Sequence, residues 1–486
     1  MSQVVLPIVL PLLLAFLLPV VMRPLPGVGR WLGPLLLVYD LWLLGQAWPV
    51  AGAAPFSVAI GDFAPPFGIN LYIDSLALLF ALAVQLMGLL LWPWADDEEA
   101  PRRQSLALLL IASSTGMALS GDLFNIYVWY ELASVAAFGL VIDPTRAASF
   151  AASLRYLLIS GLGSVLTLVG ITLIYVRTGT LNLAQIAELA PGTLNHPLGL
   201  GALVLMLLGF GVKAELFPVN HWVPGVYASA PARISALLAG VISKLAVLVL
   251  VRLLYLLQPG PEMAGLVAGL GILGVISGEL AAWRARDLRR MLAYSSIGQL
   301  GMIFIAFSLP GKAGALAGLA LVLHHLVVKS GLFLLAERWD GALDRLRGAG
   351  RVSPLAGGLF VLFALSIVGV PPLPGFWAKL LLLQGLAAEG GWLYGTALAV
   401  FLAATVVEAS YLLRVADRLF ATPEGEAPRP SFGGLALTSL LGGGLLVALL
   451  TLNPLARTLD RVAGVAVDRD GYPLRSLPRE RGRVGE

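Results

Sequence analysis

The sequence contains no cysteine, and only 12% of its 486 residues are charged. Without cysteine, the chain cannot form disulfides, thiolate-ligated zinc sites or cysteine-ligated iron–sulfur clusters. Soluble domains usually carry about 25% charged residues, so this low charge, combined with 58% hydrophobic residues, indicates an integral membrane protein. Any electron transfer through iron–sulfur clusters is therefore expected in another polypeptide.

The sequence also lacks a polar stretch long enough for a soluble nucleotide-binding domain. Its glycines, such as those at 442–444, lie in apolar runs and favour close helix packing over phosphate binding. We therefore expect no cofactor, no metal ion and no nucleic-acid partner. Residues 1–21 have no basic n-region and no small-residue cleavage site, so we expect a first transmembrane helix rather than a signal peptide.

Long apolar runs are abundant. We count fourteen, each close to the length of about 17–25 residues that a helix needs to cross a bilayer. They are residues 3–22, 31–47, 72–94, 104–120, 123–142, 151–176, 198–223, 231–257, 262–283, 290–309, 313–337, 355–386, 392–417 and 432–452. Prolines interrupt the seventh run at 218–224 and the twelfth at 371–374. We therefore predict an all-α membrane protein with about fourteen transmembrane helices.

Basic residues are distributed unevenly between the loops. Eighteen are assigned to the ends of odd-numbered runs and the loops after them, whereas the even-numbered runs have only Arg177, Lys312 and, at the end of the eighth run, Arg252. By the positive-inside rule, the arginine-rich loops face the cytoplasm, which puts both termini on the non-cytoplasmic side of the cell inner (plasma) membrane. The seven arginines of the tail from Arg457 to Arg483 oppose this trend, but a tail after the last helix constrains topology weakly.

Lysine is used differently from arginine. Only five lysines occur, and four of them lie inside apolar runs: Lys213, Lys244, Lys329 and Lys379. A lysine near the bilayer centre costs several kcal/mol and therefore needs a reason. Because lysine, unlike arginine, changes its protonation state readily when buried, we interpret these four residues as proton-carrying groups.

The runs form a weak internal repeat. Runs four to eight and nine to thirteen match in order, and the two interrupted runs occupy corresponding places. Such repeats with interrupted helices indicate a transport path near the membrane midplane. We predict four parts: three helices in residues 1–95, five-helix repeats in 104–257 and 262–418, and the last helix with its basic tail in 419–486.

The stretch 210–244 carries the first break. Lys213 and Lys244 lie on the two runs that flank its prolines, and a broken helix beside buried lysines predicts an ion path. Glu131, in the middle of run 123–142, needs a partner if it is ionised, and Lys213 is the natural candidate. We interpret this pair either as a static salt bridge or as a charge pair that forms and breaks as protons pass.

Histidines accompany the third buried lysine. His325 and Lys329 are four residues apart and share a helix face, whereas His324 is offset. Histidine titrates near neutrality, so we interpret His325 and Lys329 as a proton relay, with a hydrogen-bonded core pair of histidines as the alternative. Adjacent histidines cannot reach opposite faces of one haem iron, and further ligands for zinc are missing.

Four residues are candidate accessory groups: Glu215, His221, His324 and Glu408. Glu215 follows Lys213 by two residues, so we expect it to face a neighbouring subunit or to help gate ion entry. Glu408 lies in the middle of its run and is expected either to pair with Lys379, the counterpart of Lys213 after the second break, or to contact another subunit.

Several segments resemble the antiporter-like subunits of respiratory complex I, of Mrp-type sodium/proton antiporters and of membrane-bound hydrogenases. They are GDLFNIYVWYELAS, GVKAELFPVNHWVPGVY, SALLAGVISK, RDLRRMLAYSSIGQLG, HHLVVKSGLFLL and VGVPPLPGFWAK, and the resemblance runs from about residue 70 to 418. It implies fourteen helices with two inverted five-helix repeats, each offering a proton half-channel. It also implies that Glu131 and Lys213 form a coupling pair, that Lys244, His325 and Lys329 form a central relay, and that Lys379 lies near the outer exit.

The sequence thus predicts a proton-translocating subunit of a multisubunit membrane complex, most like the D subunit of Mrp-type cation/proton antiporters. The first alternative is a proton-pumping membrane subunit of a complex I-like NADH-quinone oxidoreductase or membrane-bound hydrogenase. The second is a non-transporting membrane scaffold whose charges form static pairs. The expected partners are other membrane subunits, the lipid bilayer and protons, with sodium as the exchanged ion of an antiporter.

Overall fold

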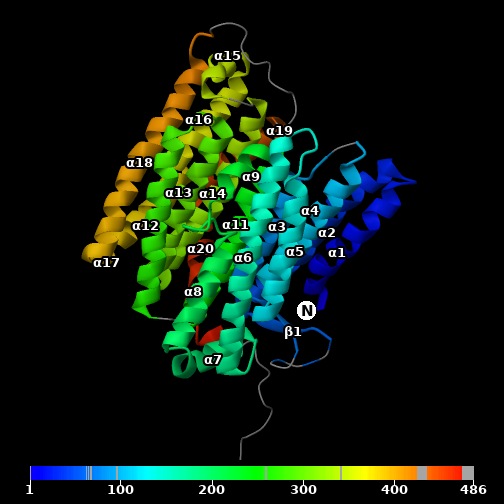
Figure 1. Cartoon of the computed structure of the whole chain (residues 1–486), viewed down its shortest axis with the longest axis vertical. Coiled ribbons are helices and arrows are strands. Elements are labelled where there is room, and N and C mark those ends of the chain that lie inside the picture. The colour runs from blue at the N-terminus through cyan, green and yellow to red at the C-terminus, as the bar shows by residue number, and fades with distance from the viewer. Residues whose placement is uncertain are drawn as a thin grey trace, which may run out of the picture.

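The computed structural model describes residues 2–472 except 62, 64, 66–67, 95–96, 258–259, 340–341 and 424–434. Of the predicted basic loop and tail residues, Arg429 and the four arginines from Arg475 to Arg483 lie outside the described residues. The described chain is almost entirely helical, and most helices run roughly along the long axis of the molecule (Figure 1).

The elements follow one another in this order. The first part contains η1 (Ser2–Val5), α1 (Leu6–Met22), α2 (Pro26–Ala53), β1 (Phe56–Ala59), β2 (Asn70–Ile73), α3 (Ser75–Leu90), α4 (Ala100–Leu119) and α5 (Leu123–Val141). The middle contains α6 (Ala147–Thr178), α7 (Leu183–Thr193), α8 (Pro197–Gly211), α9 (Val223–Ser229), α10 (Ala232–Leu237), the π-helical η2 (Leu238–Ile242), α11 (Ser243–Leu257), α12 (Pro261–Arg284), α13 (Leu288–Ser308) and α14 (Gly311–Arg338). The last part contains η3 (Leu343–Leu346), α15 (Ala349–Val352), α16 (Pro354–Val368), α17 (Pro374–Glu389), α18 (Gly391–Phe420), α19 (Leu435–Leu450) and α20 (Leu452–Val467).

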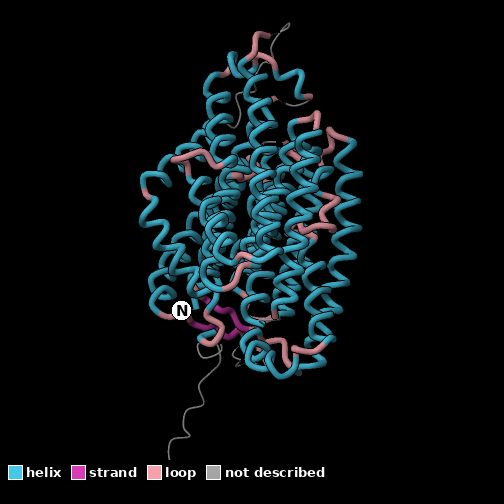
Figure 2. The backbone as a smooth tube through the Cα atoms, turned by 90° about the vertical axis from the view of Figure 1, so that its left-hand side faces the viewer, coloured by secondary structure: helices cyan, strands magenta, loops and turns pink. Residues whose placement is uncertain are grey.

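The two ends of the bundle differ. The antiparallel hairpin of β1 and β2 lies at the same end as the N-terminus and α7, as the magenta strands in Figure 2 show. At the opposite end lies α15, where the backbone of Leu343 donates to the carbonyl of Arg286. Because Arg286, Arg345 and Arg351 lie on the connections there, we call this the arginine-rich end.

The described helices identify a multi-pass membrane protein. Nine of them are long and apolar enough to cross a membrane, or eleven if two sharply bent helix pairs each form one span. Two shorter apolar helices, α3 and α8, also belong to the bundle. By length and composition, the described residues therefore support nine to eleven membrane spans, and the exact count of fourteen stays a prediction.

Glycines set the closest helix packing beside the centre of the bundle. A Cβ added to Gly278 of α12 would lie 2.5 Å from the amide nitrogen of Gly298 on α13. A Cβ added to Gly301 would lie 2.6 Å from the carbonyl oxygen of Gly271. Small residues allow membrane helices to approach closely, so these glycines hold α12 directly against α13.

Two features of the fold differ from the sequence prediction. Residues 452–467, expected to be tail, form α20, which is bent by 87° from α19 and buries Leu459, Val462 and Ala463. Arg252, counted from the sequence among the basic residues at helix ends, is buried within α11 and donates to Asp74 Oδ1 at 2.8 Å. The rings of Tyr72 and Tyr472 lie beside its guanidinium, with centroids 5.8 and 5.6 Å away. Apolar periodicity could not anticipate these contacts, because they join residues far apart in the chain.

Candidate functional site

Charged and titratable side chains are buried through the centre of the bundle. The buried members are Lys213, Glu215, Lys244, Glu279, His324, His325, Lys329, Lys379 and Glu408. They come from both predicted repeats: two lie in the segment between α8 and α9, and the others lie in α11, α12, α14, α17 and α18. Buried charges need compensating contacts, so the contacts of each group show what it can do.

The first helix break begins earlier than the prolines suggest. Helix α8 ends at Gly211, and α9 starts at Val223, so Lys213 lies within the irregular segment 212–222 rather than in the middle of a helix. Trp222 Nε1 donates to the carbonyl of Val212 at 2.9 Å, and Asn220 Nδ2 donates to the carbonyl of Glu215 at 3.2 Å. These side chains donate to carbonyls that have lost their regular α-helical amide donors at the break.

Lys213 is held by α5, but not through Glu131. Its ammonium donates to Ser134 Oγ and lies 3.1 Å from the centroid of the Tyr130 ring, which is a close cation–π contact. Glu131 lies in the middle of α5, as predicted, and interacts with Lys213 electrostatically. Its Oε1 atom nevertheless has no hydrogen-bond partner among the described residues, so the two groups are neighbours without direct contact.

Glu215 faces the interior of the bundle. It is only 1% exposed, and Tyr227 Oη donates to its Oε1 at 2.7 Å. It also interacts electrostatically with Lys244 and Lys329. The prediction that it faces a neighbouring subunit is therefore wrong. The backbone of Glu215 has φ 58, a left-handed conformation uncommon for a residue with a side chain, and this turns the chain within the break.

Lys244 follows a π-helical turn. The amide of Ser243 donates to the carbonyl of Leu238 in the π pattern, so the carbonyl of Ala239 lacks its usual amide donor. Lys244 Nζ donates to this Ala239 carbonyl at 2.6 Å and to Ser243 Oγ at 2.9 Å. Such π turns often occur at functional sites. Here the turn gives a buried ammonium a carbonyl acceptor in its own helix.

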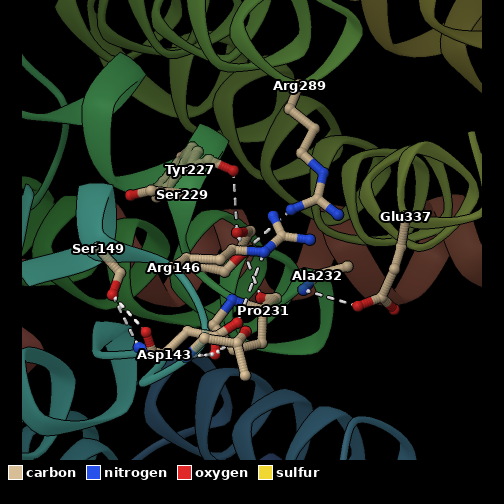
Figure 3. Close-up of polar contacts among 12 residues, drawn as sticks. Asp143, Arg146, Ser149, Tyr227, Ser229, Pro231, Ala232, Arg289 and Glu337 are labelled. Atoms are coloured by element: carbon tan, nitrogen blue, oxygen red, sulfur yellow. Dashed lines mark hydrogen bonds and ion pairs between the residues drawn. The ribbon is translucent and has the colours of Figure 1, made fainter. Parts of the chain in front are cut away.

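Polar contacts fix the link between α9 and α10, as Figure 3 shows. Arg289 Nη1 donates to the carbonyl of Ala230 at 3.3 Å, and the amide of Ala232 donates to Glu337 Oε1 at 3.5 Å. Ser235 Oγ donates to the carbonyl of Tyr227 at 3.1 Å. This link joins the helix of Tyr227, which donates to Glu215, to the helix that leads to Lys244.

The histidines of α14 point to different neighbours. His325 Nε2 lies 3.4 Å from Ser296 Oγ, whereas His324 Nε2 lies 2.9 Å from Ser366 Oγ on α16. Lys329 Nζ donates to Ser295 Oγ at 2.7 Å and to the carbonyl of Leu292 at 3.1 Å. As the spacing predicts, His325 and Lys329 both face α13, and His324 faces the second break.

The ion pair that the sequence left open lies beside the second break. This break comprises residues 369–373, and Lys379 lies in the helix that follows, α17. Lys379 Nζ donates to Glu408 Oε2 at 2.6 Å and to the carbonyl of Val368 at 3.2 Å. Gln299 Nε2 donates to the other carboxylate oxygen of Glu408 at 2.7 Å. Glu408 therefore pairs with Lys379 and is 0% exposed, so it does not contact another subunit.

Besides the helix-capping Asp74 and Asp122, the sequence analysis missed two buried carboxylates that lie within helices. Glu279 on α12 accepts a hydrogen bond from Tyr411 Oη at 2.9 Å. Asp40 on α2 is 0% exposed, and neither of its carboxylate oxygens has a hydrogen-bond partner in the described part of the chain. Both could have been found by the signal that identified Glu131, which is a carboxylate inside an apolar run. Glu279 interacts with the central charges, whereas Asp40 lies apart from them.

His221 does not join the buried groups. It is exposed and lines a cavity of about 400 Å³ together with Arg155, Pro218 and Arg290. Across residues 2–472, apart from the undescribed gaps, no cluster of three or more histidine, aspartate or glutamate residues could hold a metal ion. The chemistry that this arrangement supports is the movement of protons between buried groups.

Comparison with known proteins agrees with this chemistry. Residues 120–406 match the family described as "NADH:quinone oxidoreductase/Mrp antiporter, TM". The N subunit of the NADH-quinone oxidoreductase of Desulforudis audaxviator is 34% identical over 423 residues, which cover 82% of this chain and 83% of that protein. The D subunit of the Na(+)/H(+) antiporter of Bacillus subtilis is 29% identical over 391 residues, covering 77% and 78%. A chain in the structure of an archaeal membrane-bound sulfane sulfur reductase matches with a TM-score of 0.91 and 30% identity, covering 98% of this chain and 100% of that chain.

Proposed function

Because the chain belongs to the NADH:quinone oxidoreductase/Mrp antiporter membrane family, we propose that it is an ion-translocating subunit of a multisubunit membrane complex. In this proposal it is most like the D subunit of Mrp antiporters, and protons pass along its buried charged groups. Other membrane subunits are its partners and supply either cation exchange or the redox reaction that drives transport.

One observation carries the proposal. Of the four buried lysines, only Lys379 has a carboxylate within hydrogen-bonding distance among the described residues. The other three ammonium groups contact hydroxyls, carbonyls or an aromatic ring. A scaffold without transport is expected to compensate its buried charges by direct ion pairs, because an unpaired buried charge is costly. Hydroxyl and carbonyl contacts instead suit groups whose charge changes.

The proposed path uses each group in turn. Glu131 and Lys213 act as the coupling pair, and Glu215 lies between Lys213 and Lys244. Lys244, His325 and Lys329 form the central relay, and Lys379 with Glu408 leads toward the outer exit. His324 and His221 are accessory groups, His324 beside the second break and His221 at the cavity near the first.

The finer architecture is also part of the proposal. We propose fourteen spans, with inverted five-helix repeats at 104–257 and 262–418 acting as proton half-channels, flanked by 1–95 and 419–486. Corresponding contacts support the inversion: Asp122 caps α5 and bridges to Asn182, whereas Asp287 caps α13 and bridges to Ala342 at the other end of the bundle. The arginine-rich end is proposed to face the cytoplasm, which leaves both termini outside.

A second candidate is favoured by sequence identity. The NADH-quinone oxidoreductase relative is 34% identical, whereas the antiporter relative is 29% identical. In this alternative the chain pumps protons for a redox complex, and its partners hold the redox groups. Purification of the native complex separates the two candidates. Partners that carry flavin or iron–sulfur clusters favour the redox complex, and their absence from a purified, transport-active complex favours the antiporter.

Replacing Lys213 by alanine tests the shared proposal. The native complex should be purified with the variant chain, reconstituted into vesicles, and assayed for coupled proton movement with a pH-sensitive dye. We expect a loss of about a hundredfold, because a positioned proton donor or acceptor contributes that much or more.

The matched control is Lys312→Ala, which removes the one lysine outside the apolar runs. Lys312 is exposed and pairs with the equally exposed Asp460 at 2.7 Å, so its loss should leave transport unchanged. Unchanged transport by the Lys213 variant, at normal complex levels, would contradict the proposed function.

A further inference from the structure

Glu279 is a buried carboxylate that has no place in the path described above. It lies on α12, close to the end of that helix at Arg284, and is 1% exposed. Helix α12 packs against α13 and α18, and Glu279 faces these two helices, whereas Leu273 and Leu280 of α12 are exposed. A carboxylate buried between membrane helices is costly unless it has a function or firm compensation.

The surrounding residues are shaped to hold the Glu279 carboxylate. Tyr411 Oη of α18 donates to its Oε2 at 2.9 Å. On α13, a Cβ added to Gly298 would lie 2.2 Å from its Oε1, so a larger residue at position 298 would require the Glu279 carboxylate to move. Oε1 itself has no hydrogen-bond partner among the described residues. The carboxylate therefore accepts one hydrogen bond at Oε2, and its Oε1 is available to accept another among the described residues.

A line of hydroxyl groups connects Glu279 to Lys329. Lys329 Nζ donates to Ser295 Oγ at 2.7 Å, and Ser295 in turn interacts with the Tyr411 hydroxyl. Glu279 also interacts electrostatically with Lys329, with Lys379 and with Glu408. The ionisable groups that face Glu279 thus come from α14, α17 and α18, and α13 contributes the hydroxyl of Ser295.

Glu279 also lies close to a cavity at the arginine-rich end. This cavity has a volume of about 460 Å³ and is lined by Trp283, Arg284, Arg414 and Arg418, among others. Trp283 is four residues beyond Glu279, a distance of about 6 Å along the helix axis. Arg414 Nη2 donates to the carbonyl of Trp283 at 2.8 Å, which ties α18 to the end of α12 beneath the cavity.

We propose that Glu279 exchanges protons between Lys329 and the cavity at the arginine-rich end, through Ser295 and Tyr411. In one direction the Lys329 ammonium gives a proton to Ser295, Ser295 gives its own to Tyr411, and Tyr411 gives its own to the Glu279 carboxylate. Each hydroxyl accepts one proton and releases one, so the net change is one proton moved from Lys329 to Glu279. Glu279 then releases the proton to solvent in the cavity, and the same hops in reverse carry a proton from the cavity to Lys329. This inference rests on the proposed function, because Glu279 would exchange protons with the central relay of Lys244, His325 and Lys329 at a second entry point.

The test compares Glu279→Gln with a matched buried carboxylate in the reconstituted native complex. Glutamine keeps the size of the side chain and an oxygen for Tyr411 but cannot take up a proton. We expect about a tenfold loss of coupled proton transport, and Tyr411→Phe, which removes one oxygen from the line, should reduce it similarly. The control is Asp40→Asn, whose carboxylate is equally buried but has no charged group acting on it within the described part of the chain, and its transport should match the wild type.

A spectroscopic readout separates proton carrying from a packing role. Infrared difference spectra recorded across a pH titration should contain a carboxyl stretching band that Glu279→Gln removes and Tyr411→Phe shifts, while Asp40→Asn retains it. Wild-type transport rates in Glu279→Gln would overturn the inference, as would an unchanged carboxyl band. If Glu279→Gln fails to assemble, Tyr411→Phe decides, and wild-type transport in that variant overturns the inference.

The Lys213→Ala variant distinguishes a failure of the Glu279 branch from a failure of the proposed function. If Lys213→Ala abolishes transport and Glu279→Gln does not change it, the proposed function stands and the Glu279 branch fails. If Lys213→Ala also transports normally, the proposed function itself fails.

Discussion

The two helix breaks of this protein treat a buried lysine in different ways. In the first, Lys213 lies inside the irregular segment, and its ammonium contacts the Tyr130 ring and the Ser134 hydroxyl. In the second, Lys379 lies in the helix after the break and is held by Glu408 at 2.6 Å and by the Val368 carbonyl. That carbonyl belongs to the last residue of α16, where the negative end of the helix dipole favours a cation.

This difference shows that a helix break determines where a lysine lies in the bundle but not which side chain pairs with it. The first break contains two charged residues, Lys213 and Glu215, and gives each of them neutral contacts. The second contains none and receives its lysine from the next helix, already paired. Stability should therefore depend strongly on the carboxylate at the second break and weakly on the one beside the first.

Removing Glu408 should have the largest effect on stability. In Glu408→Ala the ammonium of Lys379 remains buried without its carboxylate, and we expect a loss of about 3–5 kcal/mol in the free energy of unfolding. Thermal unfolding of the purified complex in detergent measures it. Replacing both partners, as in Glu408→Leu with Lys379→Met, should restore most of the stability. If Glu408→Ala alone were as stable as the wild type, the two breaks would not differ in how strongly stability depends on a carboxylate.

Changing Tyr130 should have an intermediate effect. Tyr130→Phe keeps the ring under Lys213 and loses only the hydrogen bond from Oη to the Gly209 carbonyl, at a cost of about 1 kcal/mol. Tyr130→Leu also removes the cation–π contact and should lose about 2 kcal/mol more. The same unfolding measurement applies. Equal stabilities for the two variants would mean that the ring does not stabilise the Lys213 ammonium.

Changing Glu131 should have the smallest effect on stability. Because its Oε1 has no hydrogen-bond partner among the described residues, Glu131→Gln should alter the unfolding free energy by less than about 0.5 kcal/mol. Coupled transport should fall all the same, since Glu131 still acts on Lys213 through space. A stability loss comparable to that of Glu408→Ala would identify Glu131 and Lys213 as a static structural pair.

The sequence predicted well those features that depend on composition along a single segment. Long apolar runs identified the membrane helices, and the four lysines inside them are all buried. Proline placed both breaks, although α8 ends at Gly211, well before Pro218. The four-residue spacing of His325 and Lys329 predicted a shared face, because both lie on one uninterrupted helix.

Features that depend on contacts between distant segments could not be predicted. Helical periodicity ends at a break, so nothing in the sequence indicated that Glu215 turns inward to Tyr227. The π turn before Lys244 has no local signal, and Glu279 depends on Tyr411, which lies six helices later in the chain. The sequence could not decide whether Glu408 pairs with Lys379 or contacts another subunit, because its partner depends on how α17 and α18 pack.

The Arg252–Asp74 ion pair and its two tyrosines also affect the making of the protein. Asp74 and Tyr72 emerge early from the ribosome and Arg252 near the middle of synthesis, whereas Tyr472 follows much later. During translation, Arg252 and Asp74 are therefore present before the second tyrosine ring. The ring centroid of Tyr472 can lie 4.0 Å from that of Tyr72 only after α20 has been synthesised. Chains truncated before this residue would leave the Arg252 guanidinium without the ring of Tyr472 beside it.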